Sequence, residues 1–404
     1  MKPMVSKNLE TSMFGAMHMR YLIKHFALLI TLYAISSVSF AEPDQLLRYS
    51  QQLSELPGVS GYEEPIRQYV IQNLKSIPGH HKVDGMGNVL FYYGEFKPNR
   101  KTVLLMAHMD EVGFVVKEID DQGFIRVIPV GGWATHVVWE QPWLIQTNKT
   151  PVPAVSGMDS LHVVADYRNV PKVSMDQFFL DTGLSRKELL EKGIHPGVSV
   201  VPDFTFKKLG NYYQGKALDD RLGIAILLNL ANRFASETKP NHSRLNIVFA
   251  FTTQEELGAR GSRIIAERIK PDVVLNLDSG IAHDYPMQFT QSKGPKLGGG
   301  PALFIFDGSM IPNHSLVEFL SDTATQSKIP FQWESEISYS QDGASVQQSG
   351  QGSAVMNIGI PTRYVHSHAG VFDYQDLKYT QDLLWTGIQQ LPKYFQKKSN
   401  KDKG

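Results

Sequence analysis

The sequence predicts an α/β protein with a parallel sheet, into which a small β-rich domain is inserted. The run 245–251, LNIVFAF, is apolar and rich in β-branched and aromatic residues, which is typical of a strand buried on both faces. A polar turn and a helical pattern at 262–269 follow it. From about 115 to 206, short alternating strands and turns replace this pattern, and the one helical stretch there, 185–192, is short.

Periodicity and turn residues indicate the other elements. Two helices, 44–56 and 63–76, are expected on either side of a break at Pro57-Gly58. The α/β pattern resumes at Lys216 and leads into a strong helix, 222–234. Further strands are expected at 82–93, 102–106, 272–277, 354–358 and 362–365, and further helices at 313–328 and 375–391.

Composition limits the chemistry that the chain can use. Its 404 residues are enough for two domains, and 40 basic residues balance 40 acidic residues, which gives no support for a nucleic-acid surface. The absence of cysteine excludes disulfides, zinc–thiolate sites and thiol nucleophiles. A metal would therefore be held by His, Asp and Glu.

The first 41 residues have the layout of a signal peptide with an extended start. Arg20 and Lys24 precede an apolar run, Phe26 to Val38, and Ser39-Phe40-Ala41 supplies small residues for cleavage. The run is too short to span a membrane, although an uncleaved anchor is the alternative. We expect an exported protein, located in the periplasm, with no stable membrane association after cleavage.

Acidic and imidazole side chains follow the apolar runs, where strands are expected to end, or precede the long helix. These residues are His108, Asp219, Glu255, Glu256, Asp278 and His366. Open α/β sheets build their sites at the carboxyl ends of parallel strands, so we expect these side chains to converge. A set of His and carboxylate ligands suits divalent metals, and it suffices for two ions if one carboxylate bridges them.

Two local spacings suggest a division of work. Glu255 and Glu256 are adjacent and point in different directions, so one can bind a metal while the other handles a proton. Asp110 lies two residues after His108, and in an extended chain this spacing returns it to the same side, where it could orient the imidazole.

Each residue has a simpler explanation when it is considered alone. The glutamate pair could open a helix, where acids favour the dipole, and Asp219 could cap the following helix. Asp278 could be an ordinary turn residue, and a strand-end His is more often a structural hydrogen-bonding group than a ligand. Their joint occurrence at equivalent positions favours a metal site.

Five motifs together resemble one protein family. AHMDEVGF, KALDDRLG, TTQEELGARG, LNLDSG and IPTRYVHS, in this order, resemble the glutamyl aminopeptidase family of dinuclear metallopeptidases, which includes the tetrahedral aminopeptidases and members labelled endoglucanases. The resemblance covers roughly residues 46–391. It implies a three-layer α/β/α metallopeptidase domain with an inserted small β-barrel domain.

The resemblance also implies domain limits and residue roles. The catalytic domain would comprise 42–115 and 208–395, and the barrel 116–207 would serve oligomerisation and access. Independently of the resemblance, the charged composition of 396–404 predicts a disordered tail. His108 and Asp278 would bind one or other metal, Asp219 would bridge both, and Glu256 and His366 would complete the set. Glu255 would be the general base, and Asp110 would support His108.

We therefore expect a metal-dependent aminopeptidase with two divalent ions per subunit, zinc or cobalt, with manganese as a further possibility. Its partners would be peptide substrates and copies of itself, in a dimer-based assembly such as a dodecamer. An acylamino-acid deacylase or carboxypeptidase, a glycosidase acting through two carboxylates, and a non-catalytic assembly protein with a degenerate site remain alternatives. A serine hydrolase has little support, because no G-x-S-x-G motif is present.

The chain departs from the family in two respects. Family members are mostly cytoplasmic, whereas this sequence suggests export. The family's Gly-Thr-Asp-Ala-like segment reads Ser340-Gln341-Asp342-Gly343-Ala344 here. The aspartate is kept and its neighbours differ, which affects the expected substrate preference more than the chemistry.

Overall fold

The computed structural model describes residues 44–160, 162–163, 174–237, 244–286 and 293–401. The segment 1–41, in which the export signal was expected, lies outside these residues. All helices and strands below belong to the unit that begins at Gln45. None of the described helices combines the length and the apolar character needed to cross a lipid bilayer.

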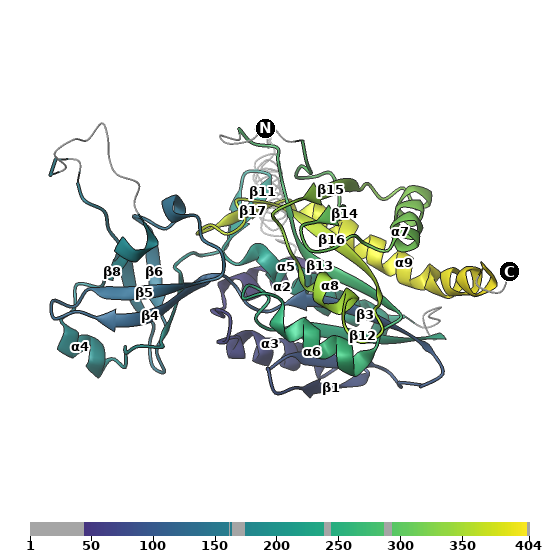
Figure 1. Ribbon diagram of the computed structural model, residues 1–404, viewed down its shortest axis with the longest axis horizontal. Coiled ribbons are helices and arrows are strands. Elements are labelled where there is room, and N and C mark those ends of the chain that lie inside the picture. The colour runs from purple at the N-terminus through teal and green to yellow at the C-terminus, as the bar shows by residue number, and fades with distance from the viewer. Residues whose placement is uncertain (1–43, 161, 164–173, 238–243, 287–292, 402–404) are drawn as a thin grey trace, which may run out of the picture. The chain divides into compact units, whose positions relative to one another are not determined.

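A large mixed sheet forms the centre of the α/β domain (Figure 1). Its middle strands are parallel neighbours in the order β12, β3, β13 and β16, and the other strands extend this row or pair with its members. The strands of the sheet are β1 (Gly79–Val83), β2 (Val89–Tyr93), β3 (Lys101–His108), β10 (Lys207–Leu209), β11 (Tyr212–Gly215), β12 (Leu245–Thr252), β13 (Val273–Ile281), β14 (Ala302–Asp307), β15 (Gln332–Glu336), β16 (Ala354–Arg363) and β17 (Gly370–Phe372).

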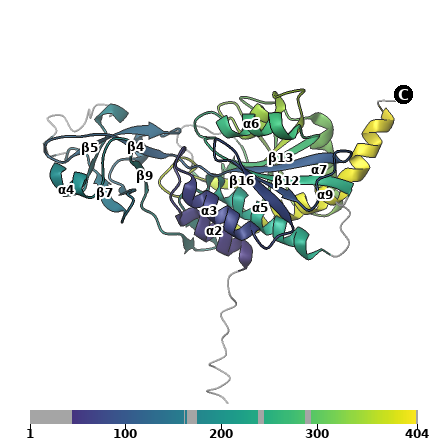
Figure 2. The same ribbon diagram turned by 90° about the horizontal axis from the view of Figure 1, so that it is seen from below.

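Helices cover both faces of this sheet (Figure 2). Alternate residues of the buried strands point to opposite faces: Val103 and Leu105 pack with one helix layer, and Leu104 and Met106 with the other. The first layer consists of α2 (Gln45–Glu55), α3 (Glu64–Leu74), α5 (Leu218–Ser236), α7 (His314–Gln326) and α9 (Tyr374–Lys401). The second consists of α6 (Arg260–Ile269) and α8 (Asp342–Gln347). The expected α/β/α layering is confirmed.

The chain between β3 and β10 forms a closed antiparallel barrel with its own apolar core. Phe114, Trp143 and Phe178 lie at the centre of that core, with ring centroids 4.8–6.0 Å apart. The barrel strands are β4 (Gly113–Ile119), β5 (Ile125–Val130), β6 (Pro142–Ile145), β7 (Val152–Ser156), β8 (Phe179–Asp181) and β9 (Ser199–Pro202), with α4 (Arg186–Glu191) and the short turns η1 (Thr135–Val137) and η2 (Met175–Gln177). The expected inserted β-barrel is therefore present. The assignment of the barrel to assembly and access stays a prediction.

Three elements differ from the sequence-based expectations. The strand expected at 82–93 is a hairpin, because the Asp84 carboxylate accepts the backbone N–H groups of Met86 and Asn88 and turns the chain. The two strands expected at 354–358 and 362–365 are one strand, β16. Helix α9 extends to Lys401 through most of the expected disordered tail, and Tyr394, near its end, packs on Phe319 of α7.

Candidate metal centre

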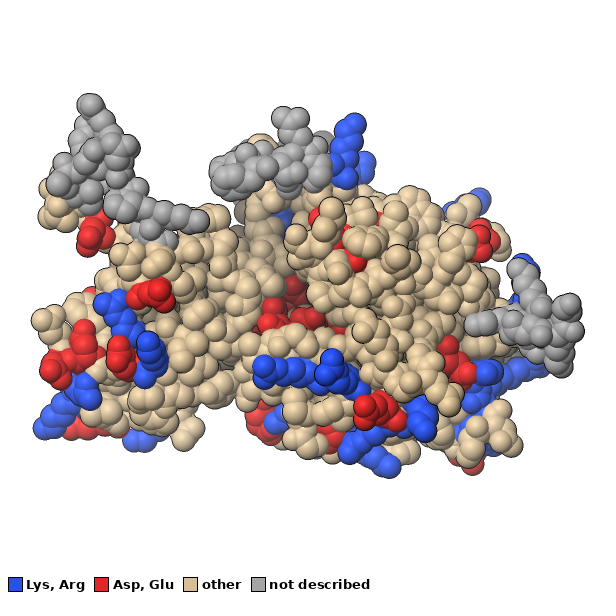
Figure 3. Space-filling model, in the orientation of Figure 1, with Lys and Arg blue, Asp and Glu red and all other residues tan. Residues whose placement is uncertain are grey.

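The parallel strands bring the predicted site residues to one edge of the sheet. His108 ends β3 and lies directly beside Thr252, the last residue of β12, and the glutamate pair follows β12. Asp278 lies within β13, the neighbour of β3 on its other side. His366 follows β16 in a loop, with a positive φ of 55°. Figure 3 shows acidic side chains gathered in a hollow on this face of the molecule.

Five of the predicted residues form two groups of side-chain atoms that could hold a metal ion, called the ligand groups below. One group is His108, Asp219 and Asp278, the other is Asp219, Glu256 and His366, and within each group one ligand atom per residue lies within 4.8 Å of the others. Asp219 belongs to both groups. Its Oδ1 is 3.0 Å from His108 Nε2 and its Oδ2 is 3.6 Å from His366 Nε2, so the two carboxylate oxygens face different histidines.

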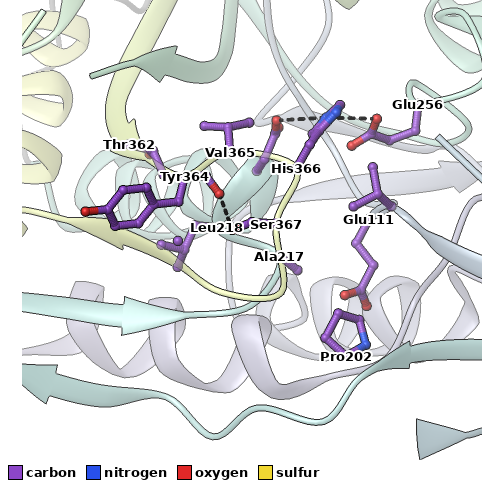
Figure 4. Close-up of a pocket in the computed structure, with 13 residues that line it drawn as sticks. Glu111, Pro202, Ala217, Leu218, Glu256, Thr362, Tyr364, Val365, His366 and Ser367 are labelled. Atoms are coloured by element: carbon purple, nitrogen blue, oxygen red, sulfur yellow. Dashed lines mark hydrogen bonds and ion pairs between the residues drawn. The ribbon is translucent and has the colours of Figure 1, made fainter. Parts of the chain in front are cut away.

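The second group is partly exposed, through His366, and the first is buried. His366 Nε2 lies 3.2 Å from Glu256 Oε2, and the two side chains point toward each other (Figure 4). His108 Nε2 is 4.0 Å from Asp278 Oδ1, and both residues are only 2% exposed. Asp219 is placed between the groups by extended backbone at the start of α5, where regular helical angles begin only after Asp220.

The local electrostatics are those of buried, mutually repelling carboxylates. Burial raises the pKa of Glu255 well above its ordinary value, and the charge of Asp342 adds to this. Burial and the neighbouring Asp219 raise the pKa of Asp278 in the same way. Burial tends to lower the pKa of His366, but the Glu256 carboxylate outweighs it and raises that pKa to about 9. The site therefore favours the binding of protons or metal cations, which reduce the repulsion between the carboxylates.

The donor set fits divalent cations. Glu256 Oε1 is buried and has no hydrogen-bond partner among the described residues, an arrangement that costs free energy unless a ligand satisfies the oxygen. Imidazole and carboxylate donors suit zinc, cobalt and manganese. A cation at each group would reduce the repulsion between the carboxylates. The cation at the second group would also give Glu256 Oε1 a partner.

Asp110 lies beneath the glutamate turn. Its Oδ1 accepts the backbone N–H of Glu255 at 3.0 Å, and its Oδ2 accepts that of Glu256 at 3.1 Å and the hydroxyl of Ser60 at 2.6 Å. His108 Nδ1 is 3.1 Å from the backbone oxygen of Asp110 and 3.5 Å from its carboxylate. The aspartate contacts His108 as predicted, but its carboxylate oxygens chiefly hold the two glutamates.

Further residues around the site had no signal in the sequence analysis. Glu63, from the start of α3, accepts the N–H of Gln254, and the Tyr339 hydroxyl lies 3.0 Å from Asp278 Oδ1. Gly131 and Gly132 of the barrel approach from the other side: a Cβ atom built on Gly131 would lie 3.2 Å from Glu256 Oε2, and one on Gly132 would lie 3.3 Å from His366 Nδ1. A Gly-Gly pair after a strand was the only visible hint of this approach.

In the segment that departs from the family pattern, Ser340 is exposed, whereas Gln341 and Asp342 are buried. Asp342 accepts a 2.5 Å hydrogen bond from Thr252 Oγ1, and the fully buried Gln341 accepts one from Asn276 in the sheet. Neither residue is among those that line the cavity beside Glu256 and His366. The departure at Gln341 therefore lies in the protein core, and its expected effect on substrate preference stays a prediction.

The structure thus places all seven predicted site residues close together. Glu255 is the one predicted acid after β12 that belongs to neither ligand group. The assignment of individual residues as ligands or base stays a prediction.

Comparisons with known proteins show the family of the chain. The family model described as M42 glutamyl aminopeptidase matches residues 87–383. A lysyl aminopeptidase from Pyrococcus furiosus is 30% identical, over 84% of this chain and 96% of the relative. A solved aminopeptidase from the archaeon Desulfurococcus kamchatkensis is 31% identical, with a TM-score of 0.79, covering 85% of this chain and 94% of that one.

A further solved structure connects the fold to large assemblies. The TET1 peptidase of Pyrococcus horikoshii, which can assemble into a tetrahedron or a large octahedral shell, is 26% identical, with a TM-score of 0.74. The comparison covers 84% of this chain and 98% of that one. The resemblance stated from the five motifs is confirmed.

The family membership corrects one expectation, the signal peptide and the periplasmic location. The comparisons that show the family, over residues 87–383 and over 84% of the chain, contain no evidence for a signal peptide. The pattern behind the expectation was a run of apolar residues, Phe26 to Val38, after two basic residues, which is a weak signal because short apolar runs have many origins. We do not retain export among the properties of the protein.

The converging histidines and carboxylates, the α/β/α fold with its inserted barrel and the match across most of the chain lead to one conclusion. The chain belongs to the M42 glutamyl aminopeptidase family and is a metal-dependent aminopeptidase.

Proposed function

We propose that the protein removes N-terminal residues from peptides at a site that holds two divalent metal ions. The observation that carries this proposal is the position of Asp219, whose two carboxylate oxygens face the two histidines of different ligand groups. His108 and Asp278 would hold one ion, Glu256 and His366 the other, and Asp219 both. When bound, the ions would polarise the scissile carbonyl and lower the pKa of a water molecule.

Glu255 is the proposed general base. It follows β12 at the same edge of the sheet as the ligands and lies outside both ligand groups, so its carboxylate is available for proton transfer. It would accept a proton from the attacking water and deliver it to the leaving amine. Hydrogen bonds from its N–H to Asp110, and from the preceding N–H to Glu63, hold its backbone in place.

We further propose a homo-oligomer, supported by the similarity to the TET1 peptidase and by the separate barrel with its own core. The inserted barrel would contribute to assembly and limit access to the site. Zinc and cobalt are the proposed metals, with manganese as a third candidate, because all three accept imidazole and carboxylate ligands.

The test measures metal content and turnover in the same samples of Glu255→Gln and Glu256→Gln. Glu255→Gln should keep its metal and lower kcat by roughly 10²–10⁴-fold, since the amide cannot accept the proton. Glu256→Gln should lose metal as well as rate, and excess metal should partly restore it. Glu267→Gln, at an exposed position of α6, is the matched control. Loss of metal in Glu255→Gln with retention in Glu256→Gln would reverse the two roles.

A further inference from the structure

The proposed ligand His366 lies on a loop between two paired strands. Residues 364–369, called the His366 loop below, join the end of β16 to the start of β17. These two strands pair antiparallel up to Arg363 and Val371. The strand pair fixes both ends of the loop, whereas the middle, where His366 lies, must be positioned by other contacts.

The backbone of the His366 loop is strained. Tyr364 and His366 have φ angles of 62° and 55°, in the left-handed region that residues other than glycine rarely adopt. Such residues keep this conformation when surrounding contacts impose it. Within the loop, Ser367 Oγ donates to the backbone oxygen of Tyr364 at 2.5 Å (Figure 4). This bond supports the shape of the loop, but its position relative to the rest of the site requires contacts outside the loop.

His368 ties this loop to the barrel. Its Nε2 lies 2.6 Å from the backbone oxygen of Pro142, at the start of β6. Because a carbonyl oxygen can only accept a hydrogen bond, Nε2 carries the hydrogen. The two residues are 226 positions apart in the chain. The bond therefore joins the barrel to the α/β domain two residues after a proposed metal ligand.

The barrel side of this contact is firmly held. The Pro142 oxygen also accepts the N–H of Asp203, and β6 is paired with β9. The imidazole of His368 packs edge-to-face against Trp143, with ring centroids 5.3 Å apart, and against Phe204 at 6.1 Å. Trp143 belongs to the barrel core, and His368 itself is 8% exposed. The loop is thus attached to a rigid part of the barrel.

The barrel borders the His366 loop at a second place. A Cβ atom built on Gly132 would lie 3.3 Å from His366 Nδ1, so the barrel turn is close to one side of the imidazole. The other ring nitrogen, Nε2, faces Glu256 and Asp219. A change in the position of the barrel would therefore reach the imidazole through Gly132 and through His368.

We propose that His368 is a positioning residue that couples the position of the barrel to the second ligand group, Asp219, Glu256 and His366. In this structure His366 Nε2 is 3.2 Å from Glu256 Oε2. Without the bond to Pro142 the strained loop would gain freedom, and ordering it again would oppose metal binding. Because such coupling is reciprocal, an ion at the second group would in turn stabilise the contact with the barrel. The role of the ion rests on the proposed function.

The first experiment measures metal binding without turnover. Metal-free wild type and His368→Phe are titrated calorimetrically with zinc and, separately, with cobalt. Phenylalanine keeps a ring beside Trp143 and Phe204 but has no donor for Pro142. Glu256→Gln identifies the binding event of the second group as the one that it weakens. We expect His368→Phe to weaken this event at least about tenfold and to leave the other unchanged.

Three further variants isolate the hydrogen bond. His368→Gln should restore the affinity, because its amide nitrogen can take the place of the imidazole Nε2. His368→Asn is too short to reach Pro142, so it should behave as His368→Phe does and replaces that variant if the latter fails to fold. His195→Phe is the control in the barrel, at an exposed histidine bonded to the backbone oxygen of Pro196. Wild-type affinity in His368→Phe and His368→Asn, or equal weakening in His368→Gln, would overturn the inference.

Hydrogen exchange of the metal-free protein separates this inference from the proposed function. Peptides that cover 364–369 should exchange roughly fivefold faster in His368→Phe than in the wild type, since a hydrogen bond of ordinary strength is lost. A wild-type protein that binds a single ion would refute the proposed two-ion site, while faster exchange that His368→Gln reverses would still support the role of His368. Unchanged exchange in His368→Phe and His368→Asn would overturn it.

Discussion

The Asp110 carboxylate accepts the backbone N–H groups of Glu255 and Glu256, one on each oxygen, at 3.0 and 3.1 Å. The same residue follows His108 in sequence and contacts its imidazole through its backbone oxygen at 3.1 Å. Asp110 therefore links the end of β3 to the turn after β12. The buried Asp110 carboxylate therefore fixes the backbone of Glu256, a proposed metal ligand, and that of Glu255, the proposed base, relative to each other.

Replacing Asp110 by asparagine should lower kcat with little change in KM. The amide can accept on only one atom, so one glutamate N–H loses its partner, and a hydrogen bond to a charged group is worth about 1.5–3 kcal/mol. We expect kcat to fall roughly 10- to 100-fold while the protein stays folded. Steady-state kinetics and metal analysis on the same samples check this.

Asp120→Asn provides a matched control for this prediction. Asp120 accepts the N–H groups of Gln122 and Phe124 in an exposed barrel turn, so it has the same local role away from the site. Its replacement should leave kcat unchanged. An unchanged kcat in Asp110→Asn would show that the glutamate turn keeps its geometry without this carboxylate.

Tyr339→Phe should weaken metal binding. The hydroxyl contacts Asp278 Oδ1 at 3.0 Å, and the ring stacks on Phe304, a contact that phenylalanine keeps. Loss of a hydrogen bond to a metal-ligating carboxylate costs roughly 10- to 100-fold in metal affinity or activity. Competition with a chromogenic chelator measures the affinity, and Tyr69→Phe, which removes a hydroxyl bonded to Gln52 at the surface, is the control. Equal affinities in the two variants would contradict the role of Tyr339.

The parts of the site that could be predicted from sequence are those whose positions follow from strand topology. His108 and the glutamate pair were found because neighbouring parallel strands must end at the same edge of the sheet, and β3 and β12 do so in register from Lys101 to His108. Asp219 was included because of its position before a long helix, and the structure adds that its two oxygens face different histidines.

The residues that were missed lie in loops, where tertiary packing decides the position. Glu63 and Tyr339 have no periodicity that marks them, and they reach the site because α3 and the loop before α8 pack beside it. The buried ion pair between Lys216 and Glu111 joins residues that are 105 positions apart in the chain. At the N-terminus, local pattern alone led to an export signal that the family membership does not support.

Gly132→Ala should impair the metal site through steric contact. The new Cβ would lie 3.3 Å from His366 Nδ1, tighter than ordinary van der Waals contact, so the imidazole would have to shift. Small displacements of catalytic groups can cost up to about 10²-fold in rate, and we expect at least a tenfold fall in kcat. Gly157→Ala, whose Cβ would meet only Phe179 at 3.5 Å, is the barrel control. Equal activity of the two variants would argue against a role for the barrel turn at the site.

Asp376 should make the stability of the fold depend on pH. The buried carboxyl group accepts the backbone N–H groups of Gly298 and Gly300 at 2.8 and 2.7 Å, yet burial outweighs these bonds and raises its pKa to about 7. A pKa raised by folding means that the folded state binds the proton more tightly than the unfolded state. The resulting stability is fully present below the unfolded pKa of about 4 and is lost as the pH rises through 7.

Chemical denaturation at pH values between 4 and 8 tests this directly. The loss attributable to Asp376 cannot exceed about 4 kcal/mol, since one pKa unit corresponds to about 1.4 kcal/mol. Asp376→Asn removes the titrating group, so it should flatten the decline of the unfolding free energy between pH 5 and 8, although losing one acceptor lowers its overall stability. Asp322→Asn, at an exposed position of α7, should keep the wild-type slope. If Asp376→Asn shows the same slope as the wild type, Asp376 does not titrate in this range in the folded protein.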